Sequence, residues 1–312
     1  MTLKQFGSKG WTPEQLGSLI GKTYIITGAT AGTGFEAART LLSKGAKVVM
    51  LNRNENKSNA TVELFKQEFG SDADISFVQM DLAVMQSVRD AAEEILKNIL
   101  HIDALICNAG IAQVAKQQMT KDGFESQIGV NHFGHFLLAG LLFETIAKSE
   151  GRIVVVASNG YRMGLKKIQF EDINFDRNYN PWKAYSQSKL AQMMFAYELQ
   201  RRVLIKGQKV QVHVCHPGAS RTDLINNHAN LATRIAWSLL SRFAQSAEQG
   251  AWSQIMCATQ DGLKPERYYG PTKAQMVGPV DAGRLEPFAL DKDVAAKLWA
   301  LSEEKTSFRW PD

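Results

Sequence analysis

Six short and largely apolar runs alternate along the chain with longer amphipathic stretches, and this alternation limits the folds that the sequence can adopt. The runs cover residues 23–27, 47–51, 75–79, 104–107, 152–157 and 210–214. Strands that alternate with helices form a parallel sheet with helices on both faces, and short continuous apolar runs are typical of strands covered on both sides. The sequence therefore predicts an α/β fold with a doubly wound parallel sheet.

Length and hydropathy favour one large domain. A chain of 312 residues with 45% hydrophobic content can bury a sizeable core without splitting. We expect residues 1–20 to be an extension packed on a single domain, residues 21–312, with a substrate-side region at about 220–250 and a C-terminal extension at about 260–312. No apolar run is long enough to span a bilayer and no signal peptide is recognised, so we expect a cytoplasmic protein without an integral membrane segment.

Charge and cysteine content argue against two classes of function. The net charge is +5, but lysine and arginine are spread along the chain. This pattern argues against nucleic-acid binding and suits an anionic dinucleotide equally well. The cysteines Cys107, Cys215 and Cys257 lack metal-ligand spacing and fit a reducing compartment.

The histidines and one serine raise two further possibilities, which the sequence does not favour. His132, His135, His213 and His216 have no carboxylate or cysteine at ligand spacing, so we expect structural histidines and no metal. Ser158 does not lie in the G-x-S-x-G motif of an acyl-transfer nucleophile, which argues against a hydrolase.

The first apolar run leads into a glycine-rich turn and then into a helical pattern. The turn carries Gly28, Gly32 and Gly34 in the spacing G-x-x-x-G-x-G. Glycines let the backbone approach a phosphate closely, and the free N–H groups of a helix start favour an anion. In the first strand–turn–helix unit this pattern indicates a dinucleotide site, although a simple tight turn is the alternative.

Polar residues and glycine follow five of the predicted strands. These residues are Gly28, Arg53, Asp81, Asn108 and Ser158. Right-handed crossovers place the carboxyl ends of parallel strands along one edge, where open α/β sheets bind ligands. We therefore expect these five residues to lie near a common site.

Tyr185 and Lys189 are four residues apart in a predicted helix and therefore share one face. Free tyrosine has a pKa of about 10, and a neighbouring cation favours the phenolate, so the pair could act as an acid or base near neutral pH. The spacing alone also fits an ordinary surface pair.

Together these motifs resemble the short-chain dehydrogenase/reductase family over roughly residues 20–225. The residues that carry the resemblance are Gly28, Gly32, Gly34, Asp81, Leu82, Asn108, Ala109, Gly110, the segment 130–136, Ser158, Tyr185, Lys189, Pro217, Gly218 and Thr222. Segment 130–136 and the long stretch between Ser158 and Tyr185 resemble the retinol-dehydrogenase-like branch. The resemblance implies a Rossmann-type fold and an enzyme that interconverts an alcohol and a carbonyl by hydride transfer with NAD(P).

The resemblance also implies roles for single residues. Tyr185 would be the general acid and base, and Lys189 would lower its pKa and bind the nicotinamide ribose. Ser158 would hold the substrate oxygen, and Asn131 would anchor a water that connects Lys189 to solvent. Asp81 would bind the adenine amino group, and residues 108–110 would line the adenosine ribose. We expect the cofactor-binding residues to be Gly28, Thr30, Gly32, Thr33, Gly34, Asn52, Arg53, Asp81, Leu82, Asn108, Ala109, Gly110, Tyr185, Lys189, Pro217, Gly218 and Thr222.

The choice of dinucleotide depends on the residues that follow the second run. An acidic residue there would bind the ribose 2′-hydroxyl, whereas a cation would meet a 2′-phosphate. This chain has Asn52 and Arg53 and no acid. The guanidinium suits a phosphate, and Asn52 could donate beside it, so we expect NADP(H) to be preferred over NAD(H).

Two segments rich in apolar side chains favour an apolar aldehyde, ketone or alcohol as substrate. One segment carries Tyr161, Phe170, Tyr179 and Trp182 between the two catalytic positions, and the other is 225–243. Both could wall a pocket, and packing in the core is the alternative.

Two other functions stay open at this point. The chain could bind NADP(H) as a sensor or scaffold without turnover, although a sensor has no need of Tyr185. It could also reduce a carbon–carbon double bond on the same scaffold. The resemblance allows a homodimer or homotetramer through the helices that contain Asn131 and Tyr185, unless the C-terminal segment blocks that surface.

Overall fold

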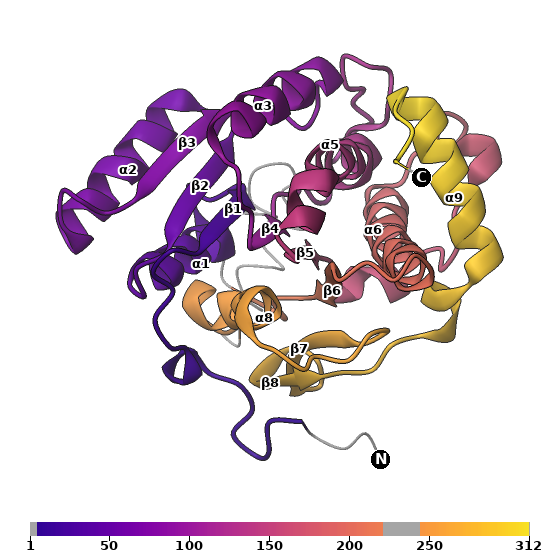
Figure 1. Cartoon of the computed structure of the whole chain (residues 1–312). Coiled ribbons are helices and arrows are strands. Elements are labelled where there is room, and N and C mark those ends of the chain that lie inside the picture. Colours follow the sequence, from indigo (N-terminus) through magenta and orange to yellow (C-terminus); the bar gives the residue numbers. More distant parts are fainter. Residues whose placement is uncertain (1–4, 221–243, 312) are drawn as a thin grey trace.

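An eight-stranded sheet with helices on both faces forms the centre of the molecule (Figure 1). The computed structural model describes residues 5–220 and 244–311. The strands are β1 Thr23–Thr27, β2 Lys47–Asn52, β3 Ile75–Gln79, β4 Ala104–Cys107, β5 Arg152–Val156, β6 Gln211–Cys215, β7 Tyr268–Lys273 and β8 Val277–Ala282. Their order is β3-β2-β1-β4-β5-β6-β7-β8, and all neighbours are parallel except β7 and β8. The predicted α/β doubly wound sheet is confirmed.

Helices cover the two faces in two groups. The helices are α1 Gly32–Leu42, α2 Glu55–Phe69, α3 Met85–Asn98, α4 Ser126–Ile128, α5 Gly134–Lys148, α6 Pro181–Ile205, α8 Ala247–Thr259 and α9 Lys292–Thr306. Successive strand residues point to opposite faces, so Ile25 packs with α3, α5 and α6, whereas Ile26 packs with α1, α2 and α8. The sheet is therefore buried on both sides, as its apolar strands require.

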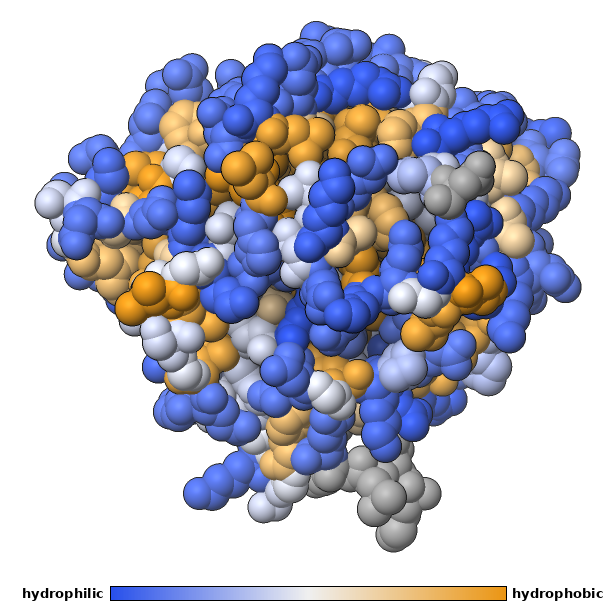
Figure 2. Space-filling view, in the orientation of Figure 1, coloured by the Kyte–Doolittle hydropathy of each residue, from blue (hydrophilic) through white to orange (hydrophobic). Residues whose placement is uncertain are grey.

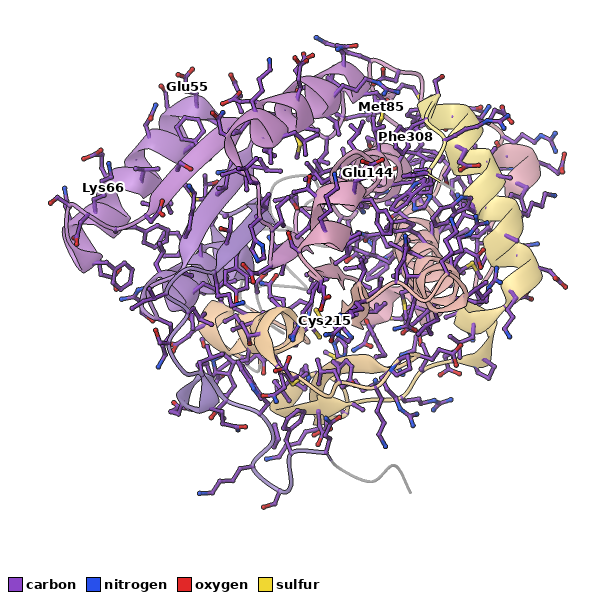
Figure 3. The ribbon with its side chains drawn as sticks, in the orientation of Figure 1. Glu55, Lys66, Met85, Glu144, Cys215 and Phe308 are labelled. Carbon is purple, nitrogen blue, oxygen red and sulfur yellow. The ribbon has the colours of Figure 1, made fainter. Side chains whose placement is uncertain are left out.

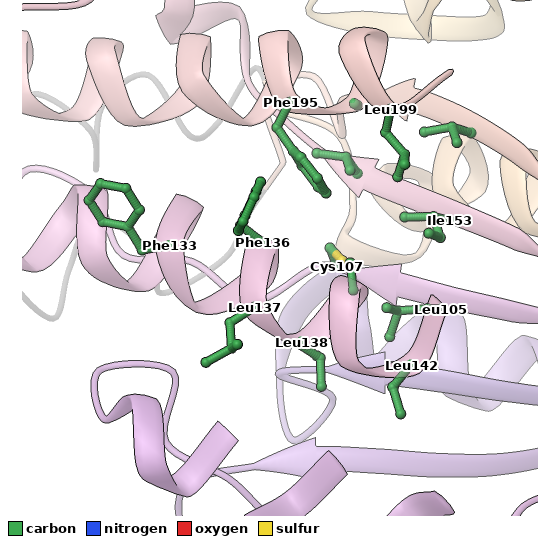
Figure 4. Packing of buried hydrophobic residues seen from close by; sticks show 14 of the residues in the cluster. Leu105, Cys107, Phe133, Phe136, Leu137, Leu138, Leu142, Ile153, Phe195 and Leu199 are labelled. Carbon is green, nitrogen blue, oxygen red and sulfur yellow. The ribbon is translucent and has the colours of Figure 1, made fainter. Parts of the chain in front are cut away.

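Aromatic rings fill the core on the α5 and α6 side. Phe136 of α5 meets Phe195 of α6, with ring centroids 5.3 Å apart, in the same buried cluster as Leu105 and Ile153 of the sheet (Figure 4). The edge-to-face arrangement is one that aromatic pairs prefer. This packing fixes α6, which carries Tyr185, against the sheet.

The C-terminal helix α9 and the residues after it cover part of α5 and α6. Trp310 packs on Phe136 and Phe143 with ring centroids 5.6 and 5.2 Å apart. Phe308 lies on Gly140 of α5, where a Cβ atom would overlap the ring. This chain therefore occupies part of the surface that the resemblance assigns to pairing, and the oligomeric state stays a prediction.

The segment that precedes β1 runs beside β8. The Trp11 backbone N–H donates to the Val280 carbonyl at 2.9 Å, and the Trp11 side chain is fully buried. The Phe6 N–H donates to the Asp281 carboxylate at 3.1 Å. Residues 5–11 are thus tied to the C-terminal hairpin.

The outer surface is mainly polar. Glu55 and Lys66 of α2 point away from the sheet, whereas Cys215 lies inside the molecule at the end of β6 (Figure 3). Figure 2 shows hydrophobic residues as patches between hydrophilic ones. Within residues 5–220 and 244–311, no helix combines the length and the apolar character that crossing a membrane requires.

Candidate active site

The carboxyl ends of five parallel strands bring the predicted residues to one edge of the sheet. Gly28 follows β1, Arg53 follows β2, Asp81 follows β3, Asn108 follows β4 and Ser158 follows β5. The strand order changes direction between β1 and β4. Open α/β sheets bind their ligands at such a switch point, so the geometry agrees with the predicted site.

The glycine-rich turn leaves its backbone open to a ligand. Gly28 has φ +70°, a left-handed conformation that a Cβ atom disfavours. A Cβ on Gly34 would overlap the Gly28 carbonyl oxygen and the Asn108 amide. The Asn108 Nδ2 donates to the Thr27 and Gly28 carbonyls at 3.0 and 3.1 Å, and the Thr33 hydroxyl donates to Asn108 Oδ1 at 3.0 Å. Asn108 and Thr33 therefore shape the turn through their side chains.

Helix α1 begins directly after this turn and points its N-terminus at the site. Its N-cap residue is Ala31, whose side chain cannot accept a hydrogen bond, and Gly32 follows. Thr30 and Gly32 are partly exposed. The first N–H groups of the helix, together with the helix dipole, can therefore bind a pyrophosphate.

The ends of β2 and β3 carry the residues predicted for the adenosine side. Asp81 Oδ1 accepts from the Ala83 N–H at 2.9 Å, which leaves its other oxygen for a ligand, and Leu82 beside it is buried. Arg53 is exposed, and its guanidinium makes no hydrogen bond or ion pair within the described part of the chain. The guanidinium is therefore placed where a phosphate could reach it.

The side chain of Asn52 turns inward from the end of β2, and its predicted donation beside Arg53 stays a prediction. Its Oδ1 accepts from the Ala29 N–H at 2.8 Å, which turns the amide inward, and the side chain is buried. Its Nδ2 has no hydrogen-bond partner within the residues described. Asn52 therefore fastens β2 to the glycine-rich turn, and Arg53 is left as the candidate for selecting the phosphate.

Tyr185, Lys189 and Ser158 meet at the start of α6. The Tyr185 ring packs on Gly160, where a Cβ atom would lie 2.8 Å from the ring, and Ser158 Oγ accepts from the Gly160 N–H at 3.1 Å. The Lys189 Nζ lies 5.9 Å from the centre of the Tyr185 ring. It donates to the Val156 carbonyl at 3.2 Å, and an ammonium has further donors for a ligand.

Burial controls the protonation of this pair. It raises the pKa of Tyr185 to about 12, although a hydrogen bond with Ser158 opposes the rise. It also lowers the pKa of Lys189 to about 7. Desolvation is the largest cause of both shifts, and the expectation that the ammonium would lower the pKa of Tyr185 stays a prediction. At neutral pH the phenol keeps its proton.

Asn131 lies in a π-helical turn, Gly129–Phe133, close to Lys189. Its Oδ1 accepts from the Ile111 N–H at 2.9 Å, and its Nδ2 donates to the Ser188 hydroxyl at 2.9 Å. Gly110 separates it from Lys189, since a Cβ there would lie 3.1 Å from Asn131 Oδ1 and 3.4 Å from Lys189 Nζ. The side chain of Asn131 is thus engaged within the protein, and its role in holding a water stays a prediction.

The loop after β6 supplies the last predicted cofactor residues. The Gly218 N–H donates to His216 Nδ1 at 3.2 Å, and the Pro217 carbonyl accepts from the Ser220 hydroxyl at 2.7 Å. Thr222 lies outside the described residues, as does the apolar stretch 225–243.

Ala109, another predicted cofactor residue, lies in the loop after β4. Its N–H donates to the Thr27 hydroxyl at 2.9 Å.

Of the four predicted pocket aromatics, Trp182 is the one that stands exposed beside Tyr185. The two rings meet edge to face at 6.5 Å, and Trp182 is 43% exposed. Tyr161 is fully buried, and the Tyr179 hydroxyl donates to the Val114 carbonyl at 2.7 Å. Phe170 is half-buried beneath the Lys297 ammonium. A hollow of about 450 Å³ beside Trp182 is lined by Met163, Gly164, Leu165, Asn180, Trp182 and Lys183.

The histidines near the site are buried in the protein. Burial lowers the pKa of His135 to about 4 and that of His216 to about 3, so both rings are neutral. Among residues 5–220 and 244–311, no group of histidine, cysteine and acidic side chains is arranged to hold a metal ion.

Residues 22–170 match the family model described as short chain dehydrogenase. Retinol dehydrogenase 14 of Mus musculus is 38% identical to this chain over 92% of the chain and 86% of its own length. The chain belongs to the short-chain dehydrogenase family. Retinol dehydrogenase 12 of Homo sapiens is 34% identical over 94% of the chain and 88% of its own length. An uncharacterized protein from Mycobacterium paratuberculosis has a crystal structure that matches with 36% identity and a TM-score of 0.79, covering 97% of this chain and 100% of that one.

Membership in the short-chain dehydrogenase family makes this chain an NAD(P)-dependent oxidoreductase that acts on CH–OH and C=O groups of small molecules. The predicted family, its retinol-dehydrogenase-like branch and the enzyme class are confirmed. The residues fit a dinucleotide, because the turn at Gly28 and Gly34 has no room for side chains and the start of α1 is uncapped.

Sequence reasoning missed two groups of this short-chain dehydrogenase site. Gln192 Oε1 accepts from Lys189 Nζ at 2.8 Å, and its position three residues further along α6 was the available signal. The turn between β7 and β8 reaches the residues that follow Ser158, and the glycines and prolines of these two strands hid the strand pattern.

Proposed function

We propose that this short-chain dehydrogenase prefers NADP(H), that its substrate is an apolar alcohol or carbonyl compound, and that Tyr185 transfers the proton. The observation that carries the proposal is the burial of Tyr185 beside Ser158 and Lys189, at the same edge of the sheet as the glycine-rich turn. A protonated phenol at neutral pH is the form that gives a proton to a growing alkoxide.

Tyr185, Ser158 and Lys189 have different roles in the proposed reaction. When bound, the nicotinamide supplies or accepts the hydride. Tyr185 gives its proton to the substrate oxygen in reduction and takes it back in oxidation, while Ser158 Oγ holds that oxygen by a hydrogen bond. The phenolate left after reduction attracts a proton to Lys189, whose Nζ is held by the Val156 carbonyl and by Gln192. Lys189 therefore stabilises the charge that forms on Tyr185.

The overall proposal is tested with the purified protein. NADPH oxidation is followed with a panel of apolar aldehydes and ketones, and the products are identified. Formation of an alcohol supports the proposal, whereas a saturated carbonyl product indicates reduction of a carbon–carbon double bond. Cofactor binding without turnover of any compound indicates a sensor.

Replacement of Arg53 with alanine tests the cofactor preference. We expect the Kd for NADPH to rise about 10- to 100-fold, because a hydrogen bond to a charged group contributes about 1.5–3 kcal/mol. The Kd for NADH should stay within about twofold, since its ribose has no 2′-phosphate. Fluorescence titration measures both, and Lys66→Ala at the far end of α2 is the matched control. Tighter binding of NADH than of NADPH by the unchanged protein would contradict the assignment.

Replacement of Trp182 with alanine tests the apolar substrate. Retinol, in the names of the two relatives, is an apolar alcohol, and Trp182 is the exposed ring beside Tyr185. We expect kcat/KM for a long-chain aldehyde to fall about tenfold, or ~1.4 kcal/mol, as one aromatic contact is lost. The value for a small polar aldehyde should not change. Leu100→Ala, which removes another exposed apolar side chain (88% exposed) before β4, is the control and should leave both values unchanged. If Trp182→Ala lowered kcat/KM equally for the two aldehydes, Trp182 would not contact the apolar part of the substrate.

A further inference from the structure

The hairpin between β7 and β8 has an unusual tip. We define the hairpin tip as Ala274, Gln275 and Met276. Ala274 and Gln275 have φ +51° and +54°, left-handed conformations that are uncommon for residues with a Cβ atom. Ala274 and Met276 are exposed, yet Gln275 between them is 7% exposed. A polar side chain folded inward from an exposed turn indicates that the tip is held by specific partners.

One set of partners belongs to the turn that follows Ser158. The Gln275 carbonyl accepts from Asn159 Nδ2 at 2.5 Å, and Gln275 Oε1 accepts from Arg162 Nη1 at 2.7 Å. Asn159 and Arg162 are the two ends of the short helical turn that Ser158 caps. The Tyr185 ring packs on Gly160 in the same turn. The hairpin tip therefore holds the turn that Ser158 caps, and Ser158 is the residue proposed to bind the substrate oxygen.

The other partners belong to the loop after β6. The Ala219 N–H donates to the Met276 carbonyl at 2.8 Å, and a Cβ on Gly218 would overlap that carbonyl oxygen. The Asn159 amide also lies 3.4 Å from His216 Nδ1, the atom that accepts from the Gly218 N–H. The tip thus contacts both the turn that follows Ser158 and the loop that is predicted to bind the cofactor.

The remaining polar atom of Gln275 anchors it to the chain beyond the hairpin. Its Nε2 donates to the Arg284 carbonyl at 2.9 Å, so both ends of the buried amide are hydrogen-bonded. A buried amide with all partners in place is rigid, and losing one partner leaves a buried polar group unsatisfied. Gln275 is therefore suited to fix the distance between two loops that share no strand.

We propose that Gln275 is a positioning residue that sets Ser158 relative to the loop at Pro217 and Gly218. The inference rests on the proposed function, because it takes Ser158 to hold the substrate oxygen. Gln275 does not touch the reacting atoms. Its side chain acts through Arg162 and the Arg284 carbonyl, its backbone carbonyl accepts from Asn159, and the next residue, Met276, binds Ala219 of the loop after β6. A displacement of about 1 Å between reacting groups can cost about 100-fold in rate, so a brace between the two loops controls the hydride-transfer step more than ligand binding.

Replacement of Gln275 with alanine tests the proposal, because a positioning residue should affect kcat more than it affects KM or the Kd for NADPH. We expect kcat to fall about 10- to 100-fold, with KM and the NADPH Kd within about threefold of the parent. Cofactor carrying deuterium at the transferred position should then show a larger isotope effect on kcat, because hydride transfer has become slower. Gln275→Glu keeps the acceptor for Arg162 but loses the donor to the Arg284 carbonyl, so it should recover only part of the kcat that Gln275→Ala loses. Lys273→Ala, exposed on the same hairpin, is the control and should leave kcat unchanged.

Amide hydrogen exchange tests whether Gln275 stabilises the two loops, and it does not require that the protein turn over a substrate. Gln275→Ala should speed exchange of the amides in residues 158–163 and 216–220 and leave the turn at 28–34 as in the parent. If exchange in the two loops of Gln275→Ala is unchanged, the proposal is overturned whatever the activity of the variant. Faster exchange together with a kcat equal to that of the parent would also overturn it. If the parent turns over no compound of the panel, the proposed function fails and the catalytic role assigned to Gln275 is overturned with it, while exchange still decides whether Gln275 joins the two loops.

Discussion

The Tyr185→Phe variant is expected to lose about 10²- to 10⁴-fold in kcat, the range attributed to general acid–base catalysis by one side chain. The change removes the hydroxyl and keeps the ring, so the packing against Gly160 and the edge-to-face contact with Trp182 stay in place. The Kd for NADPH should therefore change by less than about threefold. Steady-state rates with the best substrate of the panel, and fluorescence titration with NADPH, measure the two quantities.

Tyr179→Phe is the matched control for this variant. Tyr179 lies six residues earlier, and its hydroxyl donates to the Val114 carbonyl at 2.7 Å. The hydroxyl also accepts from Gln127 Nε2 at 3.1 Å. Loss of the two hydrogen bonds should cost about 1–3 kcal/mol in the free energy of unfolding, with kcat near that of the parent. If Tyr185→Phe kept more than a tenth of the parental kcat, Tyr185 would not be the proton donor. Equal losses in the two variants would point to packing instead.

The inner strands could be predicted because both faces of the sheet are buried. The run 47–51 became Lys47–Asn52, and the other five runs also matched strands to within one residue at each end. The strands β7 and β8 carry Gly270, Pro271, Gly278 and Pro279, residues that weaken or interrupt a strand pattern. Their pairing depends on contacts with β6 and with the N-terminal segment, which no local pattern encodes.

Residue spacing and the positions of strand ends predicted where the site residues lie, but not their protonation or their hydrogen-bond partners. The four-residue spacing placed Tyr185 and Lys189 on one face, and both are buried near Ser158. The direction of the Tyr185 pKa could not be predicted in this way, because it depends on how deeply the whole fold buries the pair. The inward amide of Asn52 has the same origin, since its partner, the Ala29 N–H, belongs to the turn after the neighbouring strand β1.

The aromatic residues between Ser158 and Tyr185 show a similar limit. Tyr161 and Trp182 both lie between Ser158 and Tyr185, yet Tyr161 is fully buried and Trp182 is 43% exposed. The difference arises from distant partners. The Tyr161 hydroxyl accepts from the Glu286 N–H at 3.0 Å, and its ring meets that of Tyr268 on β7. The C-terminal extension therefore buries Tyr161, while Trp182 stays exposed beside Tyr185.

Acid is expected to destabilise this protein steeply, because four histidines are buried as neutral rings. Burial lowers the pKa of His132, His213 and His216 to about 3 and that of His135 to about 4. In the unfolded chain each titrates at about 6.5, so below that pH the unfolded state binds protons that the folded state does not. The stability contributed by the neutral rings is complete above pH 6.5, falls between there and the folded pKa values, and changes no further below them.

Each buried histidine should cost about 1.4 kcal/mol in the free energy of unfolding per pH unit within that window, so four together unfold the chain within a narrow range of acid pH. Urea denaturation at pH values from 7.5 down to 5 measures the slope. His213→Gln removes one of the four groups away from the catalytic side chains and should reduce the slope by about a quarter, or ~1.4 kcal/mol per pH unit. A free energy of unfolding that stays constant between pH 6.5 and 5 would mean that the folded protein takes up these protons, so the rings would have to be open to water.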